Sequence, residues 1–363
     1  MKRYSLVVLV LVTYCSPFLF YGQEGKDEVS QIRRINHVQV IGSHNSYKKA
    51  IAPQLFKFLE KKDTTGGIYS LQYEHIPIID QLNMGLRNLE LDAYADEKGG
   101  RFAKPKGLEW VREQPSYDPD GKMNLPGFKM LHVLDIDFRS DYYLLSDCLA
   151  DLRKWSDAHS NHETVFITLE AKDGDSNGFG TTPEPFTNEI FTALDSTLLR
   201  NLGRDHIIIP EDVKGDYSTL EEAVLHNNWP TVKQGQGRFL FILDAKGEKR
   251  NIYSKGHHSL KGRVMFINAE AGTPEAAAMI INDPENKTIP ELVSKGYIIR
   301  TRADANTTEA RSNDYSHFEA AKKSGAQIIT TDYYLPSKLF KSTYHVSFDD
   351  GGFVRENPVN VVE

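Results

Sequence analysis

Residues 38–47 read VQVIGSHNSY, and this stretch predicts how the chain folds. Its first part, Val38–Ser43, is a short β-branched apolar run, which predicts a buried strand. His44 and Asn45 follow directly, so we expect this strand to present an imidazole and an amide at its carboxyl end. A single strand end of this kind does not identify a fold or a function.

Three further apolar runs carry an acid or a histidine at or near the carboxyl end. They are Leu86–Asp92 with Glu90 and Asp92, Lys129–Val133 with His132, and Thr164–Glu170 with Glu170. Glu90 and Asp92 alternate along one strand and therefore point to the same side. Active sites of α/β barrels collect at the carboxyl ends of the strands, so these four strand ends together predict a functional face.

Four more apolar runs bring the predicted strands to eight: Arg238–Ala245, Arg263–Asn268, Gly296–Arg300 and Gln327–Thr330. Strands that alternate with helices favour a parallel sheet, and eight strands favour closure. We therefore predict a closed TIM-type (β/α)8 barrel with long loops after strands 2 and 4. The competing fold is an open doubly wound sheet, but the glycine-rich phosphate loop of that fold is missing after the first strand.

The N-terminus has the layout of a secretory signal peptide. Lys2 and Arg3 precede an apolar segment that is shorter than the ~20 residues of a membrane-spanning helix. We predict a signal peptide at residues 1–22, a single domain at residues 23–363, and a secreted or periplasmic protein. Lipid anchoring through Cys15 is the less favoured alternative. Cleavage would leave Cys148 as the only cysteine, which excludes an intrachain disulfide.

The formal net charge of −7 limits the classes of partner. Binding of nucleic acid needs a basic surface, so we do not expect nucleic acid to be the main partner. A local basic pocket could still hold an anionic lipid headgroup. No obligate protein partner is evident from the sequence.

The polar residues at the strand ends suit metal-assisted chemistry. Ca²⁺ takes roughly six to eight oxygen ligands, and four candidate ligands have hard oxygen donors: Asn45, Glu90, Asp92 and Glu170. Zinc is disfavoured because no thiolate is present. His44 and His132 beside such a cation suit proton transfer at a phosphodiester, and which of them is acid or base stays open.

These motifs resemble a known family in both order and spacing. GSHNSY at Gly42–Tyr47, GLRNLELDAY at Gly85–Tyr94, His132 and FITLEAK at 166–172 are similar to the catalytic region of calcium-dependent phosphoinositide-specific phospholipases C, especially the secreted single-domain bacterial group. The resemblance implies a closed barrel that cleaves phosphatidylinositol at a membrane surface to diacylglycerol and a cyclic or hydrolysed inositol phosphate. It also implies that His44 and His132 are catalytic, and it assigns four Ca²⁺ ligands: Asn45, Glu90, Asp92 and Glu170.

Later positions match the family less fully. Lys246 and Arg300 resemble its substrate-contacting residues. Arg302 stands where multidomain members have an aromatic residue that packs on the inositol ring, which puts ring recognition in doubt. Two alternatives stay open, a glycerophosphodiester phosphodiesterase and a catalytically silent barrel that binds headgroups. Asn45 directly after His44 favours the phospholipase over the glycerophosphodiester phosphodiesterase. A catalytically silent barrel would have lost a catalytic histidine or a metal ligand, and none is lost here.

Other polar and aromatic residues have less defined expectations. We expect His75 to lie at the surface. For Asp135 and Asp137 we expect one of two roles, to orient His132 or to hold solvent. The segment after the second strand has scattered aromatics that form either a lid, a membrane-inserting rim or small satellite cores: Trp110, Tyr117 and Phe128.

Overall fold

The computed structural model describes residues 33–174, 178 and 180–360. The predicted signal peptide and Cys15 lie outside these residues, so secretion stays a prediction. Within the described residues, no helix has both the length and the apolar character needed to cross a membrane.

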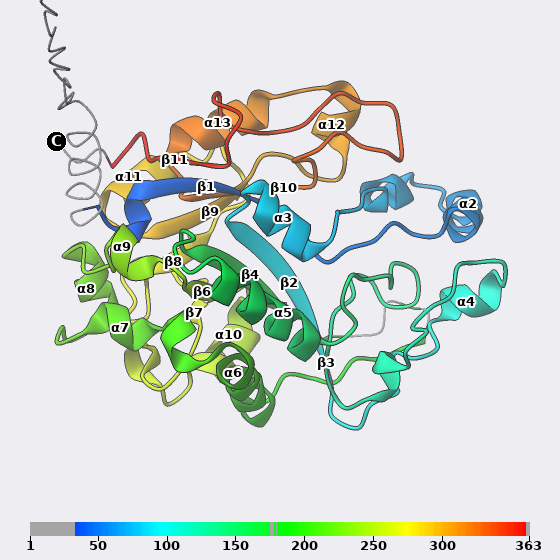
Figure 1. The fold of residues 1–363 in the computed structure, drawn as a ribbon, viewed down its shortest axis with the longest axis horizontal. Coiled ribbons are helices and arrows are strands. Elements are labelled where there is room, and N and C mark those ends of the chain that lie inside the picture. The colour runs from blue at the N-terminus through cyan, green and yellow to red at the C-terminus, as the bar shows by residue number, and fades with distance from the viewer. Residues whose placement is uncertain (1–32, 175–177, 179, 361–363) are drawn as a thin grey trace, which may run out of the picture.

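A mainly parallel sheet forms the centre of the molecule (Figure 1). Its strands are β1 (Val38–Ser43), β2 (Asn88–Asp96), β3 (Gly127–Lys129), β4 (Val165–Ala171), β5 (Ile207–Ile208), β6 (Phe239–Leu243), β7 (Phe266–Ile267), β8 (Ala278–Ile280), β9 (Ile298–Arg302), β10 (Ile328–Thr331) and β11 (Val354–Glu356). The strand order is β5-β6-β4-β2-β1-β10-β9-β8, and β7, β3 and β11 pair with β6, β2 and β1 respectively.

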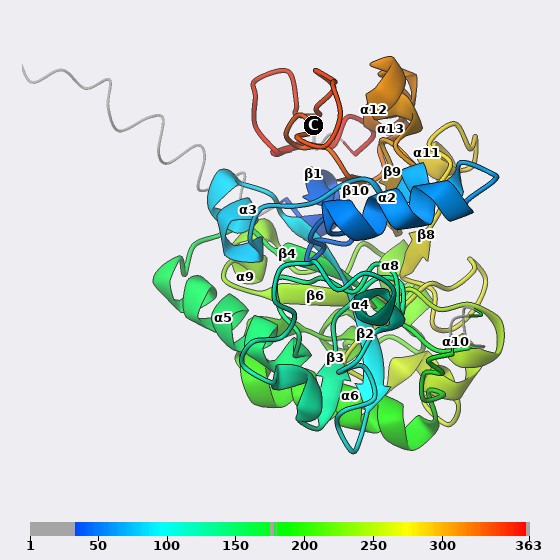
Figure 2. The ribbon, with the colours of Figure 1, turned by 90° about the vertical axis from the view of Figure 1, so that its right-hand side faces the viewer.

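Helices surround this sheet (Figures 1 and 2). The α-helices are α2 (Pro53–Lys62), α3 (Ile78–Met84), α4 (Lys106–Trp110), α5 (Leu145–Ala158), α6 (Asn188–Leu202), α7 (Pro210–Lys214), α8 (Leu220–Leu225), α9 (Val232–Gly235), α10 (Gly247–Ser254), α11 (Ile289–Ser294), α12 (Thr308–Ser312) and α13 (Ser316–Ser324). Short 3-10 helices are η2 (Ile35–His37), η3 (Gly67–Leu71), η4 (Lys122–Asn124), η5 (Arg204–His206) and η6 (His258–Leu260).

The prediction of a closed barrel is wrong, because the parallel sheet forms an open half-barrel. The sheet follows an open path from β5 to β8, and in the described residues β7 and β8 form no ladder but are linked by an isolated bridge between Asn268 and Ala278. β1 and β2 share the single pair Gly42–Asn88. The C-terminal strand β11 pairs antiparallel with the first half of β1 and so takes the edge that a closed barrel would give to β2.

The predicted third strand is also wrong. The chain forms β3 two residues earlier, at Gly127–Lys129, and β3 pairs antiparallel with the end of β2. His132 therefore lies in the loop after a hairpin and not at the end of a barrel strand. Strand β8 was not predicted, because its Ala-rich surroundings, AAAMII at 276–281, have no strand pattern.

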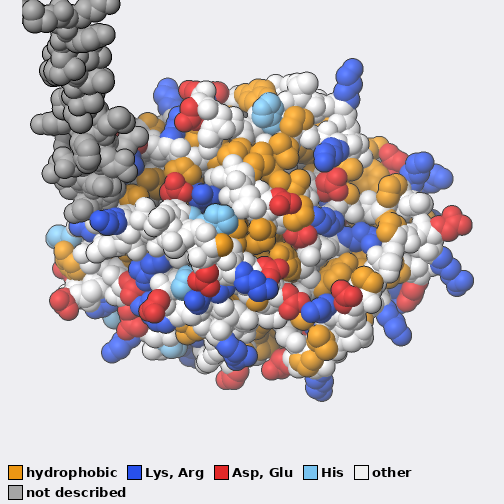
Figure 3. Space-filling model, viewed as in Figure 1, with side chains coloured by type: hydrophobic (Ala, Val, Ile, Leu, Met, Phe, Trp, Pro, Cys, Tyr) orange, Lys and Arg blue, Asp and Glu red, His pale blue; other side chains and the backbone are white. Residues whose placement is uncertain are grey.

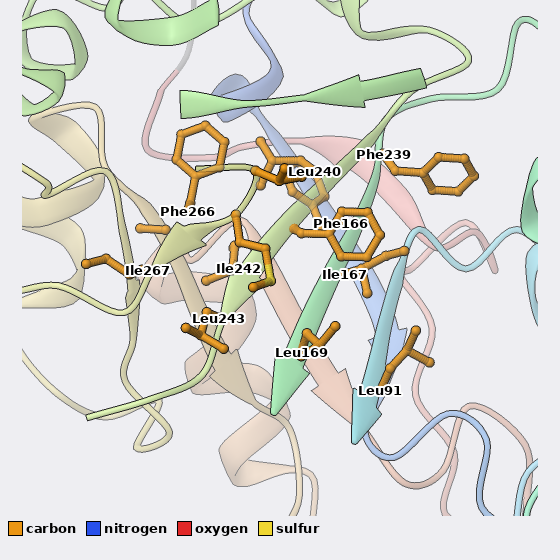
Figure 4. Close-up of a cluster of buried hydrophobic side chains, with 14 of the residues drawn as sticks. Leu91, Phe166, Ile167, Leu169, Phe239, Leu240, Ile242, Leu243, Phe266 and Ile267 are labelled. Carbon is orange, nitrogen blue, oxygen red and sulfur yellow. The ribbon is translucent and has the colours of Figure 1, made fainter. Parts of the chain in front are cut away.

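The core is built from near-continuous apolar strands, as expected for a parallel sheet that is covered on both faces. Figure 4 shows part of it, with labelled side chains from β2, β4, β6 and β7: Leu91, Phe166, Ile167, Leu169, Phe239, Leu240, Ile242, Leu243, Phe266 and Ile267. Full burial of such a side chain contributes about 1.5–3 kcal/mol. This core fixes the register of the strands whose ends carry the candidate site.

The aromatics of the segment after β2 do not form an exposed rim. Trp110 stacks on Phe58 with ring centroids 5.9 Å apart, and Tyr117 meets Phe138 edge-on at 5.0 Å. Phe128 belongs to the main core. The small satellite cores expected for Trp110 and Tyr117 are therefore present. On the face drawn in Figure 3, acidic and basic side chains are interspersed.

Candidate active site

The end of β1 has a backbone that only particular residues can adopt. A Cβ atom on Gly42 would lie 2.2 Å from the carbonyl oxygen of Asn88, so glycine is required where β1 and β2 come close. Asn45 has a φ of 50°, in the left-handed region that asparagine tolerates better than most residues. The chain therefore turns sharply directly after β1, at the position of His44 and Asn45.

Ser46 fastens this turn to β2. Its hydroxyl accepts a hydrogen bond from the backbone amide of Glu90 at 2.8 Å, and its own amide donates to the carbonyl of Glu90 at 2.9 Å. Gln81 of α3 donates to the carbonyl of Ser46 at 2.7 Å. Because of these bonds, Glu90 and the residues after β1 are fixed relative to each other.

His44 is paired with a carboxylate from the opposite end of the sequence. Its Nδ1 lies 2.8 Å from Oδ1 of Asp332, which directly follows β10, and its Nε2 lies 3.4 Å from Oε1 of Glu90. A guanidinium nitrogen of Arg302, at the end of β9, lies 3.0 Å from Nδ1. Burial, reinforced by the charge of Arg302, holds the pKa of His44 well below its usual value, which favours the neutral imidazole.

His132 has an equivalent partner. Its Nδ1 lies 2.7 Å from Oδ2 of Asp137, whose side chain is fully buried. Asp135, in contrast, bonds to the amide of Lys106 and to Thr181 and does not contact the histidine. Since a carboxylate can only accept from Nδ1, the pairing leaves Nε2 of His132 free for other contacts.

Tyr73 lies between the two histidines. Its ring centroid is 6.1 Å from that of His44 and 6.3 Å from that of His132, and its hydroxyl accepts a hydrogen bond from Nδ2 of Asn45 at 2.7 Å. Sequence reasoning missed this residue, because the segment between α2 and α3 has no period or recognisable motif. Tyr73 joins both predicted catalytic histidines and one predicted ligand into a single cluster.

His75 is buried, so the prediction that it lies at the surface is wrong. Its Nε2 lies 2.7 Å from the backbone carbonyl of His44, and its ring stacks on Tyr334 at 5.4 Å. Burial lowers the pKa of His75 to about 4. His75 thus supports the backbone that carries His44.

The four predicted metal ligands lie on neighbouring elements. Asp92 pairs with Glu170 in the β2–β4 register, and Asn45, Glu90 and Asp92 are buried, while Glu170 is partly exposed. Lys172 places its Nζ 3.4 Å from Asp92 and 3.3 Å from Glu170. Burial, which outweighs the opposing charge of Lys172, raises the pKa of Asp92 to about 7.

The donor chemistry of this region fits Ca²⁺, although its geometry does not form a coordination shell. In the described part of the chain, no three His, Cys, Asp or Glu side chains are arranged to hold a metal. Among the described residues, both carboxylate oxygens of Asp92 are nevertheless buried without a hydrogen-bond partner, which is costly for a polar group and is offset only by the ion pair with Lys172. Oxygen donors of this kind are the ligands that Ca²⁺ prefers.

The predicted substrate contacts lie at different depths. Arg300 is buried and donates hydrogen bonds to Glu90 and Asn282. Lys246 is exposed at the start of α10. Burial raises the pKa of the Asp244 carboxyl, and the charges of Arg300 and Lys246 oppose this rise. Asp244 was missed, although its position directly after β6 follows the same strand-end rule.

Comparisons with known proteins identify the family of this chain. A family model described as phosphoinositide phospholipase C, Ca²⁺-dependent, matches residues 33–358. No curated protein matches the chain.

Solved structures share the fold. A Ca²⁺-dependent phosphatidylinositol-specific phospholipase C from Streptomyces antibioticus is 18% identical with a TM-score of 0.54, covering 86% of this chain and 99% of that one. An apo calcium-dependent enzyme from a Pseudomonas species is 15% identical with a TM-score of 0.52, covering 91% and 97%. Because the family model spans most of the sequence, the chain belongs to the family of Ca²⁺-dependent phosphoinositide phospholipases C, as its motifs predict.

Proposed function

We propose that this protein cleaves phosphatidylinositol, or a related inositol phospholipid, at a membrane surface. The products are diacylglycerol and a cyclic inositol phosphate, or its hydrolysed form. The observation that supports this most directly is the pair of histidines on either side of Tyr73. Each of them, His44 and His132, has its Nδ1 held by a buried aspartate.

Such a pair can carry out both proton transfers of the reaction. An inositol hydroxyl attacks the phosphorus, and one group takes its proton as the new P–O bond forms. The P–O bond to the glycerol oxygen breaks, and the other group donates a proton to that leaving oxygen. The two histidines are assigned to these steps as a pair, and the acid and the base are not distinguished.

We assign Ca²⁺ binding to the four oxygen donors Asn45, Glu90, Asp92 and Glu170. The assignment is supported by the buried oxygens of Asp92, which have no hydrogen-bond partner among the described residues, and by the contact of Glu90 with the His44 ring. Bound calcium would offset the negative charge on the substrate phosphate. The three carboxylates of this set would otherwise repel a phosphodiester anion.

Basic residues around the site would hold the substrate. Arg300 and Lys246 are assigned to the phosphate or the inositol, because Arg300 donates a hydrogen bond to Glu90 and Lys246 closely follows the carboxyl end of β6. Arg302 contacts His44 and lies 4.0 Å from Asp332, so its guanidinium supports the His44 pair. Any ring stacking of the kind that an aromatic residue provides would have to come from another residue.

We also propose that residues 1–22 are removed as a signal peptide and that residues 23–363 form one secreted or periplasmic domain. The proposal rests on Lys2 and Arg3 before the short apolar segment. N-terminal sequencing of the exported protein tests it, with a first residue of Gln23 as the expected result. Retention of the segment would contradict it.

The reaction itself is tested by offering two substrates, phosphatidylinositol vesicles and deacylated glycerophosphoinositol, in the presence of Ca²⁺. We expect diacylglycerol and a cyclic inositol phosphate from the lipid. Preferred hydrolysis of the deacylated diester, without a cyclic product, would instead identify a glycerophosphodiester phosphodiesterase. Binding of vesicles without any product would identify a silent headgroup-binding protein.

A further inference from the structure

Lys48 is a fully buried lysine close to the candidate active site. Its Nζ donates to the backbone carbonyls of Leu71 at 3.0 Å and Tyr73 at 2.7 Å, and it lies 3.3 Å from Oδ2 of Asp137. Removing an ammonium group from water costs several kcal/mol, which only good pairing and hydrogen bonding offset. An apolar residue would fill this space at lower cost, so the charge calls for a specific explanation.

The contacts of Lys48 connect the supports of both predicted catalytic histidines. Its backbone amide donates to the carbonyl of Asn45 at 2.9 Å, so Lys48 belongs to the turn that follows β1. Its Nζ shares Oδ2 of Asp137 with Nδ1 of His132. It also lies 4.3 Å from the ring centroid of Tyr73, whose hydroxyl accepts from Asn45.

We propose that Lys48 is a positioning residue that holds His132 through Asp137. The ammonium group fixes the carboxylate, and the carboxylate fixes the ring orientation of His132 and the proton on its Nδ1. The contact with Tyr73 extends this support to Asn45. The expected effect on turnover rests on the proposed function, in which His132 transfers a proton. The expected effect on the position of the His132 ring does not rest on it.

Lys48 can affect His132 because Asp137, which lies between them, is buried. Its side chain is fully buried, its Oδ1 has no hydrogen-bond partner among the described residues, and Lys48 is the permanently charged group that pairs with it. Without Lys48, a buried carboxylate would face His132 alone, and such a group relieves its cost by taking a proton or by shifting position. Either change alters the hydrogen bond to Nδ1. A displacement of about 1 Å in a catalytic group can cost roughly 10²-fold in rate.

The chain offers a matched control in Arg263. This cation is also buried, lies 4.4 Å from the ring centroid of Tyr253, donates to the carbonyl of Tyr253 at 2.7 Å, and lies 3.3 Å from a buried aspartate, Asp195. It packs between α6 and α10 and contacts none of the predicted site residues. Arg263→Met therefore removes a buried cation of the same kind without touching the support of His132.

The test compares Lys48→Met with Arg263→Met by ¹⁵N NMR of the histidine rings and by turnover of phosphatidylinositol. Both are measured at a temperature where circular dichroism shows folded protein. The His132 signals are assigned by their loss in His132→Gln. We expect Lys48→Met alone to move these signals and to lower kcat by about 10²-fold with little change in KM. Arg263→Met should leave the signals unchanged and kcat within about twofold of wild type.

A double variant, Lys48→Met with Asp137→Asn, provides the rescue. It removes both charges and keeps an amide oxygen that can accept from Nδ1 of His132, so we expect kcat above that of Lys48→Met. If Lys48→Met does not fold, Lys48→Gln replaces it with the same expectations. Unchanged His132 signals, or equal losses of kcat in the Lys48 and Arg263 variants, would overturn the proposal. If the wild type cleaves no lipid, the proposed function fails, and the NMR comparison still decides the role of Lys48.

Discussion

Asp332→Asn is the substitution that most sharply separates a positioned catalytic histidine from a structural one. The carboxylate lies 2.8 Å from Nδ1 of His44, and its own backbone amide is held by Asp304 at 2.8 Å, so an isosteric amide should stay in place. The variant keeps an amide oxygen that can accept from Nδ1, but a hydrogen bond to a charged group, worth about 1.5–3 kcal/mol, becomes a neutral one worth about 0.5–1.5 kcal/mol. The loss is about 1–1.5 kcal/mol, and because about 1.36 kcal/mol corresponds to tenfold in rate, we expect kcat to fall about 5- to 10-fold.

The assay is the release of diacylglycerol from phosphatidylinositol vesicles at saturating Ca²⁺, together with circular dichroism to confirm the fold. Asp135→Asn is the matched control, because Asp135 is also buried and its side chain bonds, among the described residues, to Lys106 and Thr181 and not to a histidine. Its turnover should stay within about threefold of wild type if that bonding only supports the fold. A folded Asp332→Asn variant with near-normal turnover would refute the role assigned to the carboxylate.

Three further predictions follow from the same geometry. His44→Ala and His132→Ala should each lower turnover by about 10²–10⁴-fold, and their combination by less than the product, because both act on one transition state; near-normal activity of either single variant would contradict this. Asn45→Asp should keep or raise Ca²⁺ affinity by calorimetry yet lower kcat, because it adds negative charge beside the phosphate; weaker binding with normal kcat would contradict the ligand assignment. Burial raises the pKa of Asp195 from 3.8 to about 6, so its proton stabilises the folded state below about pH 4, and this contribution is lost as pH rises through 6. The unfolding free energy of wild type minus that of Asp195→Asn, measured in urea, should therefore fall by about 2 kcal/mol between pH 4 and pH 6, and a flat difference would disprove the shift.

The sequence was informative wherever a local pattern decides the structure. The bounds predicted for β1, Val38–Ser43, are those observed, because a β-branched run followed by a polar turn has few alternatives. Glu90 and Asp92 share the buried site region because alternation along a strand is a local property. The family motifs lie on these same segments, and the family match spans them.

Long-range relations were not readable from the sequence. Asp332 lies 288 residues from His44, and nothing local to either residue indicates that they pair. The strand-end rule, applied to the last strand, could have proposed Asp332 as a candidate. Tyr73 and Lys48 have no such signal, because Tyr73 lies in a segment without period and the neighbours of Lys48 in the sequence are those of an ordinary surface lysine.

The error in the barrel has a similar cause. Closure was inferred from a count of eight strands, but the count included Lys129–Val133, which belongs to no barrel strand. It also left out β11, whose residues 354–356 are too few and too polar to signal a strand. This strand pairs with the first half of β1. The backbone groups on that edge of β1 therefore have partners although β2 does not pair with them.

The proposed reaction needs calcium and the two histidines together to cleave an inositol phosphodiester. Phosphorus NMR of phosphatidylinositol vesicles, followed first in Ca²⁺, then in excess chelator, and then after Ca²⁺ is added back, tests it most directly. We expect a cyclic inositol phosphate, or the monoester formed from it, to appear in Ca²⁺, to stop accumulating in chelator, and to accumulate again when calcium returns. Full turnover in excess chelator, or no cleavage in Ca²⁺, would contradict it.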